Sequence, residues 1–463
     1  DLSSSYADWV KPDMRIFEFT SASNVKVVLN YQSQSTESAW LDYISINTKA
    51  QLKFESNPLQ FRDKRALGAA SIGFRVAGVD GNSVVWDVTN PLDPRKIQHQ
   101  SNGSFTIADA SGTLNEYVVF DPAKGNFLFP VLVEPPVANQ NIHGEEVPQM
   151  VIVTHPNFLD QSNELAEFHR NHDKLSVLVV TTPQVFNEFS SGLPDVAAIR
   201  NMMRMFYVRS KATGAPLKYL LLMGDGSYDN RNFDGPKNNF IPTYQSVNSI
   251  SPVSSFVSDD FFGLLDDGEG EVQGALDIGI GRIPCKTPAE AQLVVRKIKN
   301  YVEPDAMGTW RNQITFIADD EDQNIHMRDT EKLISVVDQE YPGFYTNKIY
   351  FDAYQQKSTA EGDKYPDVTS AINNSVKEGT LILNYVGHAN SESMAHEKVI
   401  GISEINTWNN TNKLPIFVTA TCEFSMFDAD ATSAGEYVLF NPVGGAVGLF
   451  STTRVVYSYS NYR

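Results

Sequence analysis

From residue 148 onward, the sequence alternates short, fully apolar runs with longer stretches of helical periodicity, and this rhythm limits the possible folds more than any other feature. Short apolar runs between turn signals are typical of strands that are buried on both faces. Strands that alternate with helices form a mainly parallel sheet that is covered by helices on both sides. The sequence therefore predicts two α/β subdomains in tandem, over residues 146–305 and 306–463.

The expected strands of this span, in chain order, are "QMVIVTHP", "LSVLVVTT", "LKYLLLMGD", "LDIGIGRIP", "NQITFIADD", "LILNYVGH", "LPIFVTATC" and "GGAVGLFS". The expected helices are "NELAEFHRNHDK", "DVAAIRNMMRMFYVR", "TPAEAQLVVRKIKNYV" and the stretch from Arg328 to Glu340. Asp195 is expected to cap the second helix, because its carboxylate can accept hydrogen bonds from the first free amides. The third strand is expected to end at Gly224, before a long loop.

Residues 1–145 follow a different pattern, in which short alternating runs are separated by clusters of Gly, Asn, Asp and Pro. The runs are "NVKVVLNY", "QLKFES", "SIGFRVAG", "SVVWDV" and "NEYVVFD". Turn signals at this spacing are typical of an all-β, sandwich-like domain. The Pro-rich segment "VEPPVANQNIHGEEVP" has no periodicity, and we expect it to be a linker to the first α/β subdomain.

Charge and cysteine content exclude several classes of protein. A net charge of −19 without a basic patch argues against a nucleic-acid partner. The two cysteines, Cys285 and Cys422, do not form a disulfide framework. No apolar run approaches the ~20 residues that a membrane-spanning helix needs. The chain begins with "DLSSSY", without a basic and apolar leader, so we expect any signal peptide to be removed or absent.

Three of the predicted strands end in residues that can carry chemistry. Cys422 follows "LPIFVTAT", His388 follows "LILNYVG", and the acidic run "ADDED" follows "ITFI". Taken alone, the cysteine can be a packed small hydrophobe or a nucleophile, the histidine a structural residue, and the acids a solvated loop. Because the carboxyl ends of parallel strands share one edge of a sheet, the three can also converge. A shared edge favours the functional interpretation.

A thiol beside an imidazole has a defined chemistry. The imidazole raises the thiolate fraction near neutral pH, and a carboxylate can fix the tautomer of the imidazole. The backbone N–H groups of Ala389 and Cys422 could together form an oxyanion hole. These residues predict nucleophilic catalysis through a thioester.

The motifs "NYVGHA" and "LPIFVTATC" resemble the catalytic block of the gingipain family of cysteine peptidases. Further similarity lies in "PQMVIVTHPNF", "KYLLLMGD", "SDDFFGLL" and "DIGIGRIPCKTPAEA", so that the resemblance covers about residues 148–463. It implies an α/β caspase-like catalytic domain made of two subdomains. It also implies that Cys422 is the nucleophile, that His388 is the general base and acid, and that Glu321 or Asp320 orients the histidine.

The sequence departs from the family pattern at two places. Ala389 stands where the family usually has Gly after the catalytic histidine, a change that keeps the backbone donor. Gingipains that cut after Arg place an Asp in the specificity pocket, whereas the matching region here offers the amides of Gln323 and Asn324. Preference for a basic side chain is therefore not expected.

Within the family, the closer resemblance is to sortases of the type IX secretion system. It rests on "TATCEFSMFD", "SAGEYVLFNPVGGAVGLFSTTRVVYS", "VWDVTNP" and "NQNIH". It implies that the protein cleaves the C-terminal sorting domain from secreted cargo and transfers the cargo to an amine of anionic lipopolysaccharide. It also implies a cell-surface location, peripheral to the outer membrane of a Gram-negative bacterium, beside an outer-membrane β-barrel partner. Such members continue beyond the equivalent of Arg463.

Two other functions stay open, a plain gingipain-like endopeptidase and a catalytically inactive scaffold of the secretion machinery. No cofactor is expected to be required. "DDFFGLLDDGEGE" offers carboxylates for a structural calcium ion without matching an EF-hand loop, and the gingipain resemblance keeps that possibility open. His396 and Glu397 lack a second histidine at metalloprotease spacing, which argues against zinc there. Cys285 is expected to be an inert packing residue.

Overall fold

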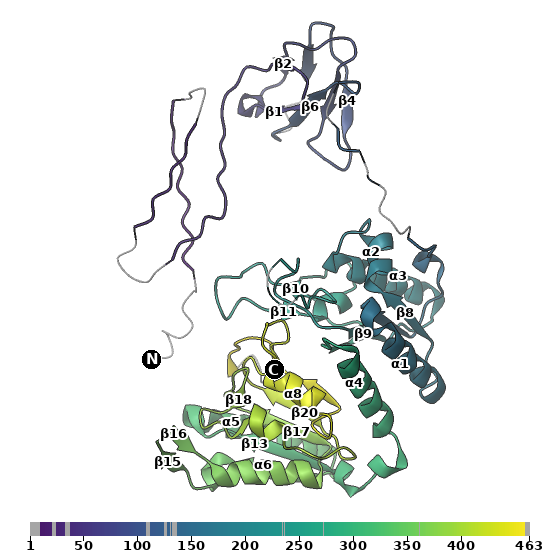
Figure 1. The fold of residues 1–463 in the computed structure, drawn as a ribbon, viewed down its shortest axis with the longest axis vertical. Helices are drawn as coiled ribbons and strands as arrows, with labels where there is room; N and C mark the ends of the chain where they lie inside the picture. The colour runs from purple at the N-terminus through teal and green to yellow at the C-terminus, as the bar shows by residue number, and fades with distance from the viewer. Residues whose placement is uncertain are drawn as a thin grey trace. The chain divides into compact units, whose positions relative to one another are not determined.

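The computed structural model describes residues 10–458, apart from residues 21–24, 33–37, 108–111, 125–126, 130, 132–136, 234, 236, 272 and 361. The chain forms two compact units, one of residues 14–138 and one of residues 1–13 with 139–463 (Figure 1). The predicted linker "VEPPVANQNIHGEEVP" lies partly outside the described residues. None of the described helices is long and apolar enough to cross a membrane.

The smaller unit is built from short antiparallel strands. One sheet has the order β1 (Leu59–Arg62), β6 (Glu116–Phe120), β3 (Val84–Asp87) and β4 (Arg95–Ile97), and a separate pair consists of β2 (Ile72–Arg75) and β5 (Ser104–Ile107). Its core contains Phe54, Phe74, Phe105, Tyr117 and Val119. The only helical segment among its described residues is the 3-10 turn Lys64–Ala66.

The prediction of a strand over "NVKVVLNY" is wrong for its described residues. Residues 25–31 form no ladder, and Val27, Val28 and Leu29 are exposed. "QLKFES" contributes only a single bridge, from Lys53 to Ala77. Alternation shows that a segment can form a strand, but a strand also needs a neighbour to satisfy its backbone hydrogen bonds. That neighbour is missing for residues 25–31 in the described part of the chain.

The larger unit contains a four-stranded parallel sheet with the order β12 (Gly279–Ile283), β9 (Tyr219–Met223), β7 (Met150–Thr154) and β8 (Val177–Thr181). Val151 and Val153 face a core shared with α2 (Thr182–Phe189) and α3 (Val196–Thr213). Met150 and Ile152 face a second core, shared with α1 (Leu159–His172) and α4 (Pro288–Tyr301). Burial on both faces explains why these strands are continuously apolar.

A second parallel sheet follows, with the order β14 (Tyr345–Tyr350), β13 (Gln313–Ala318), β17 (Ile382–Val386), β20 (Ile416–Ala420) and β21 (Gly448–Phe450). On one face, Ile314 and Phe316 pack against α5 (Glu321–Glu340). On the other, a larger core includes residues of α6 (Pro366–Glu378), α7 (Ile402–Ile405) and α8 (Ala434–Phe440).

Short elements complete the larger unit. The two-stranded pairs are β10 (Tyr244–Gln245) with β11 (Val257–Ser258), β15 (Lys357–Thr359) with β16 (Gly362–Lys364), and β18 (Ser393–Met394) with β19 (Ile400–Gly401). The 3-10 helices are Ile142–Gly144, Pro156–Phe158, Asp260–Gly263, Pro304–Ala306, Thr309–Asn312 and Phe351–Ala353.

Each strand predicted for residues 148–463 is present, and Asp195 caps α3 by accepting a hydrogen bond from the Ala197 amide. The third strand ends at Gly224, whose φ of 149° favours glycine. The predicted helix from Arg328 belongs to α5, which begins earlier, at Glu321, but is interrupted by a kink where residues 322–324 are not helical. Sequence reasoning missed the helices α2, α6, α7 and α8, the strand β14 and the short two-stranded pairs. The early start of α5 bears directly on the site.

Candidate active site

The register of β17 and β20 places His388 beside Cys422. The two strands pair in parallel up to Val386 and Ala420, and each functional residue lies two positions beyond that last pair. The Gly387 amide still donates to the Ala420 carbonyl, at 3.3 Å. His388 and Cys422 therefore occupy neighbouring strand ends on one edge of the sheet, as the sequence predicted.

A fully buried carboxylate, that of Asp319 at the end of β13, fixes the backbone of His388. One oxygen accepts the His388 amide at 3.0 Å, and the other accepts the Glu321 amide at 3.2 Å. The Tyr385 hydroxyl donates to the His388 carbonyl at 2.6 Å, and burial raises the pKa of Tyr385 well above its usual value. A Cβ on Gly387 would lie 2.4 Å from the Asp319 Cβ, so the close approach requires glycine.

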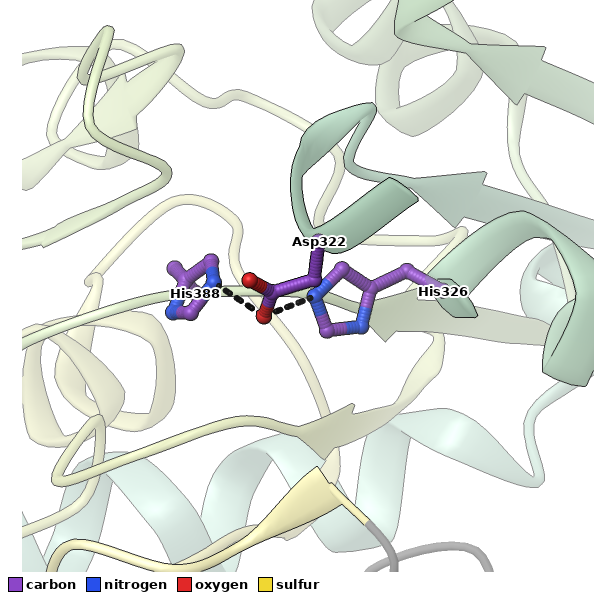
Figure 2. Close-up of side chains that lie close together, drawn as sticks. All are labelled: Asp322, His326 and His388. Atoms are coloured by element: carbon purple, nitrogen blue, oxygen red, sulfur yellow. Dashed lines mark hydrogen bonds and ion pairs between the residues drawn. The ribbon is translucent and has the colours of Figure 1, made fainter. Parts of the chain in front are cut away.

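The His388 imidazole is held by Asp322, whose Oδ2 lies 3.0 Å from Nε2 (Figure 2). A carboxylate oxygen can only accept, so the ring proton lies on Nε2 and Nδ1 carries the lone pair. The ring also lies between two other histidines, edge-on to His326 at 5.2 Å and stacked on His396 at 5.0 Å between centroids. In this tautomer Nδ1 can accept a proton, as a general base must.

The prediction that Glu321 or Asp320 orients His388 is not what the structure shows. Glu321 Oε1 lies 3.1 Å from His396 Nδ1 and raises the pKa of that ring, and Asp320 accepts the Tyr365 hydroxyl at 2.7 Å. The acid that contacts the His388 ring is instead Asp322.

A left-handed turn decides which acid faces the ring. Asp322, Gln323 and Asn324 have φ values of 54°, 57° and 63° at the start of α5. Such a conformation costs roughly 1–3 kcal/mol for each residue that is not glycine, and it is concentrated at functional sites. Gln323 and Asn324, which the sequence placed near a specificity pocket, form this turn, and the Gln323 carbonyl accepts Arg328 at 3.1 Å. Helical periodicity gives no sign of a left-handed turn.

The Cys422 thiol is half-buried and contacts the backbone of Val456. Its Sγ lies 3.5 Å from both the carbonyl oxygen and the amide nitrogen of Val456. Within the described part of the chain, it makes no hydrogen bond to His388. Burial raises the pKa of Cys422 above its usual value, so the thiolate needs a base to form. Catalytic hydrogen bonds in free enzymes are often longer than in complexes with substrate.

The two amides predicted to form an oxyanion hole are available. Ala389 forms an antiparallel bridge with Met394, but the bonds of that bridge come from the amides of Asn390 and Ala395. Among the described residues, neither the Ala389 N–H nor the Cys422 N–H has an acceptor. Free amides beside a nucleophile can stabilise the negative oxygen of a tetrahedral intermediate.

Two groups of side chains bring potential metal ligands within 4.8 Å of one another in the described residues: Asp322 with His326 and His388, and Asp266 with Glu269 and Asp277. The second group includes acids of the segment that was predicted to offer calcium ligands, and carboxylates suit that ion. Lys211 Nζ already lies 2.5 Å from Asp266 Oδ1. The group is therefore explained without an ion, and calcium stays a prediction.

Sequence reasoning missed Asp322, His326 and the role of Asp319. The left-handed turn of residues 322–324 brings Asp322 close to His326, and helical spacing does not predict such a turn. Cys285 is buried, and burial raises its pKa well above the usual value, in agreement with an inert packing role.

Comparisons with known proteins show which family and which solved structures the chain is similar to. The model of "Peptidase family C25" matches residues 143–463. Among solved structures, dimeric latent PorU from Porphyromonas gingivalis is 33% identical over 56% of this chain and 26% of its own, with a TM-score of 0.49. The Arg-specific cysteine proteinase gingipain R is 16% identical, with coverages of 70% and 67% and a TM-score of 0.51.

The complex of Porphyromonas gingivalis RgpB pro- and mature domains is also 16% identical, covers 68% of this chain and 66% of its own, and has a TM-score of 0.50. No curated protein matches the sequence. This chain spans only 26% of the length of the latent PorU chain. The two gingipain structures show the shared α/β fold.

Proposed function

Because this chain belongs to peptidase family C25, the gingipain family of cysteine peptidases, we propose that Cys422 is its nucleophile and His388 its general base. The observation that carries the proposal is the register of β17 and β20, which brings the two residues to neighbouring strand ends. The hydrogen bond between Asp322 and His388 Nε2 supports it, since this bond leaves Nδ1 free to accept the thiol proton.

The reaction then has two stages. Nδ1 of His388 takes the proton from Sγ, the thiolate attacks the peptide carbonyl carbon, and the amides of Ala389 and Cys422 stabilise the resulting oxyanion. When the C–N bond breaks, the imidazolium returns its proton to the leaving amine and a thioester remains on Cys422. Water resolves the thioester to a carboxylate, whereas an amine resolves it to a new amide. The contact of Sγ with Val456 has to open for the substrate to enter.

We propose that an amine resolves the thioester and that the protein is a sortase. It would remove the C-terminal sorting domain of type IX secreted cargo and join the cargo to an amine of lipopolysaccharide. Support comes from the resemblance of "TATCEFSMFD" and of the segment after it to such sortases. On the same ground, we propose a place at the cell surface, beside an outer-membrane partner. Gln323 and Asn324 stand in the region where Arg-specific gingipains have an Asp, and the lack of this acid favours a substrate without an Arg at the cleavage site.

The Cys422→Ala variant tests the nucleophile. We expect it to lose at least ~1,000-fold in peptide cleavage, because no other group can form the thioester. A thiol-directed covalent peptide inhibitor should label the native chain and the Cys285→Ala control but not Cys422→Ala. Mass spectrometry of the labelled chains measures this. Absence of label on the native chain would leave the inactive scaffold as the better interpretation.

The choice between hydrolysis and transfer needs a second measurement. Cargo that carries its sorting domain is incubated with the enzyme at increasing concentrations of an added amine, and the products are weighed. The sortase proposal expects an amide product that grows with amine concentration. A free carboxylate at every concentration would leave a plain endopeptidase.

A further inference from the structure

We propose that Asp322, His326 and His388 form a binding site for a divalent transition-metal ion such as Zn²⁺, and that the bound ion inactivates the base of the enzyme. The metal site stands on the geometry alone, whereas its effect on catalysis rests on the function proposed above. Metal binding and peptide cleavage are therefore separate observables.

The three ligand atoms lie close enough together to be candidate ligands of one ion. Asp322 Oδ2 lies 3.0 Å from His388 Nε2 and 3.6 Å from His326 Nε2, and all three atoms are within 4.8 Å of one another (Figure 2). An ion that binds at about 2.0–2.1 Å separates two tetrahedral ligands by about 3.3 Å. The two distances from Asp322 Oδ2 lie on either side of that value, and binding an ion requires the two imidazole rings to adjust around it.

The strongest sign of a ligand is the unsatisfied nitrogen of His326. The residue is 4% exposed, and its buried Nε2 has no hydrogen-bond partner among the described residues. A distance of 3.6 Å to Asp322 is too long for a hydrogen bond. A buried nitrogen without a partner is costly, and coordination of a cation in front of it would remove that cost.

The chemistry of the ligands selects the ion. Two imidazole nitrogens and one carboxylate oxygen suit Zn²⁺ and similar transition metals, whereas Ca²⁺ and Mg²⁺ prefer sets made of oxygen alone. Asp322 is an exposed residue, so the fourth position can be taken by water. Sites with two histidines and one carboxylate are well known for zinc.

The bound ion would act through the tautomer of His388. Without metal, Asp322 holds the ring proton on Nε2, and Nδ1 has the lone pair for the thiol proton. Coordination through Nε2 moves the ring proton to Nδ1, where the nitrogen can no longer accept. It also turns Asp322 from a partner of the base into a ligand of the ion. The metal therefore inactivates the base without touching Cys422.

The test measures metal binding on the full chain with the Cys422→Ala substitution, which removes the thiol as a competing ligand. We expect calorimetry with Zn²⁺ to give about one ion per chain, and Co²⁺ to show the visible absorption of a tetrahedral site. Adding His326→Ala or Asp322→Ala should weaken binding at least ~10-fold, since even an outer partner of a metal ligand contributes that much. The matched control is His396→Ala, because His396 stacks on His388 but lies outside the ligand set.

Far-UV circular dichroism verifies that each variant is folded. Because Asp322 is exposed, its substitution is expected to leave the fold intact. In the native chain, the Zn²⁺ concentration for half-inhibition should rise at least ~10-fold with His326→Ala. The proposal would be overturned if the His326 and Asp322 variants bound Zn²⁺ as tightly as the Cys422→Ala chain from which they are made. It would also be overturned if the Cys422→Ala substitution alone abolished binding. Failure of cleavage by the native chain would affect only the proposed function.

Discussion

Four consecutive acids after β13 show how differently neighbouring residues of one type are used. Asp319 is buried and holds the His388 amide, Asp320 accepts the Tyr365 hydroxyl, Glu321 contacts His396, and Asp322 contacts the His388 ring. Only backbone geometry distinguishes them, because their side-chain chemistry is the same. The left-handed turn at Asp322 is therefore as important to the site as the acid itself.

The Asp322→Asn variant tests this division at the residue scale. An amide can present its NH₂ to Nε2 and so favour the tautomer that has its proton on Nδ1, which cannot accept the thiol proton. We expect kcat/KM to fall roughly 10- to 100-fold, with a changed pH profile, while the fold is kept. Glu321→Gln is the matched control, since Glu321 contacts His396 instead, and it should cause little loss. Equal losses in both variants would contradict the assignment of Asp322.

The positions of His388 and Cys422 were predictable because strands that are buried on both faces leave clear apolar runs, and both residues stand directly after such a run. Other parts left weaker signals. β14, with the sequence "YTNKIY", lies at the edge of its sheet and alternates polar residues, and α6 is largely polar. The resemblance implied Glu321 or Asp320, whereas the structure places Asp322 against the His388 ring, because a turn of opposite hand that periodicity does not describe begins there.

At the scale of elements, three ionisable side chains connect the two α/β sheets, of which two are buried and the third, that of Lys286, is partly buried. Asp225 follows β9, Lys286 precedes α4, and Glu436 lies in α8. Lys286 Nζ lies 3.0 Å from Glu436 Oε1 and 3.7 Å from Asp225 Oδ2. Burial raises the pKa of Asp225 to about 8, so this carboxyl is largely protonated at neutral pH.

This raised pKa predicts how stability depends on pH. The pKa of Asp225 in the fold lies above its ordinary value of 3.8, so the native state binds the proton more tightly. The resulting stabilisation is full below about pH 4 and is lost as the pH rises through about 8. We expect Tm to fall between pH 5 and pH 8 in the native chain, and to fall less in Asp225→Asn, whose amide does not titrate.

Scanning calorimetry across this range measures the effect. Glu378→Gln is a suitable control, because Glu378 is exposed at the end of α6. If Tm falls as steeply with pH in Asp225→Asn as in the native chain, other groups dominate the pH dependence of stability.

At the scale of the whole molecule, the two compact units have separate hydrophobic cores. The core of residues 14–138 is rich in aromatic side chains, and those of the larger unit surround its two parallel sheets. The sequence predicted the change from antiparallel to parallel architecture, because alternating runs give way to continuous ones. It could not show that residues 25–31 pair with none of the strands in the described ranges, since pairing depends on the rest of the chain.

Separate cores predict separate unfolding. We expect calorimetry of the full chain to show two transitions, because each unit buries its own apolar surface. A chain that starts at residue 139 should retain one of these transitions with its midpoint unchanged within a few degrees. A single transition in the full chain, or a large shift on truncation, would mean that the units stabilise each other.

The order of the second sheet has a consequence for how the protein matures. β17 lies between β13 and β20, and each of these pairings joins segments that are far apart in the sequence. Such non-local pairings form slowly, after local helices. The proposed catalytic centre needs the ends of all three strands, so it exists only once the sheet is complete. A newly made chain is therefore expected to gain the proposed activity only after its own segments have folded.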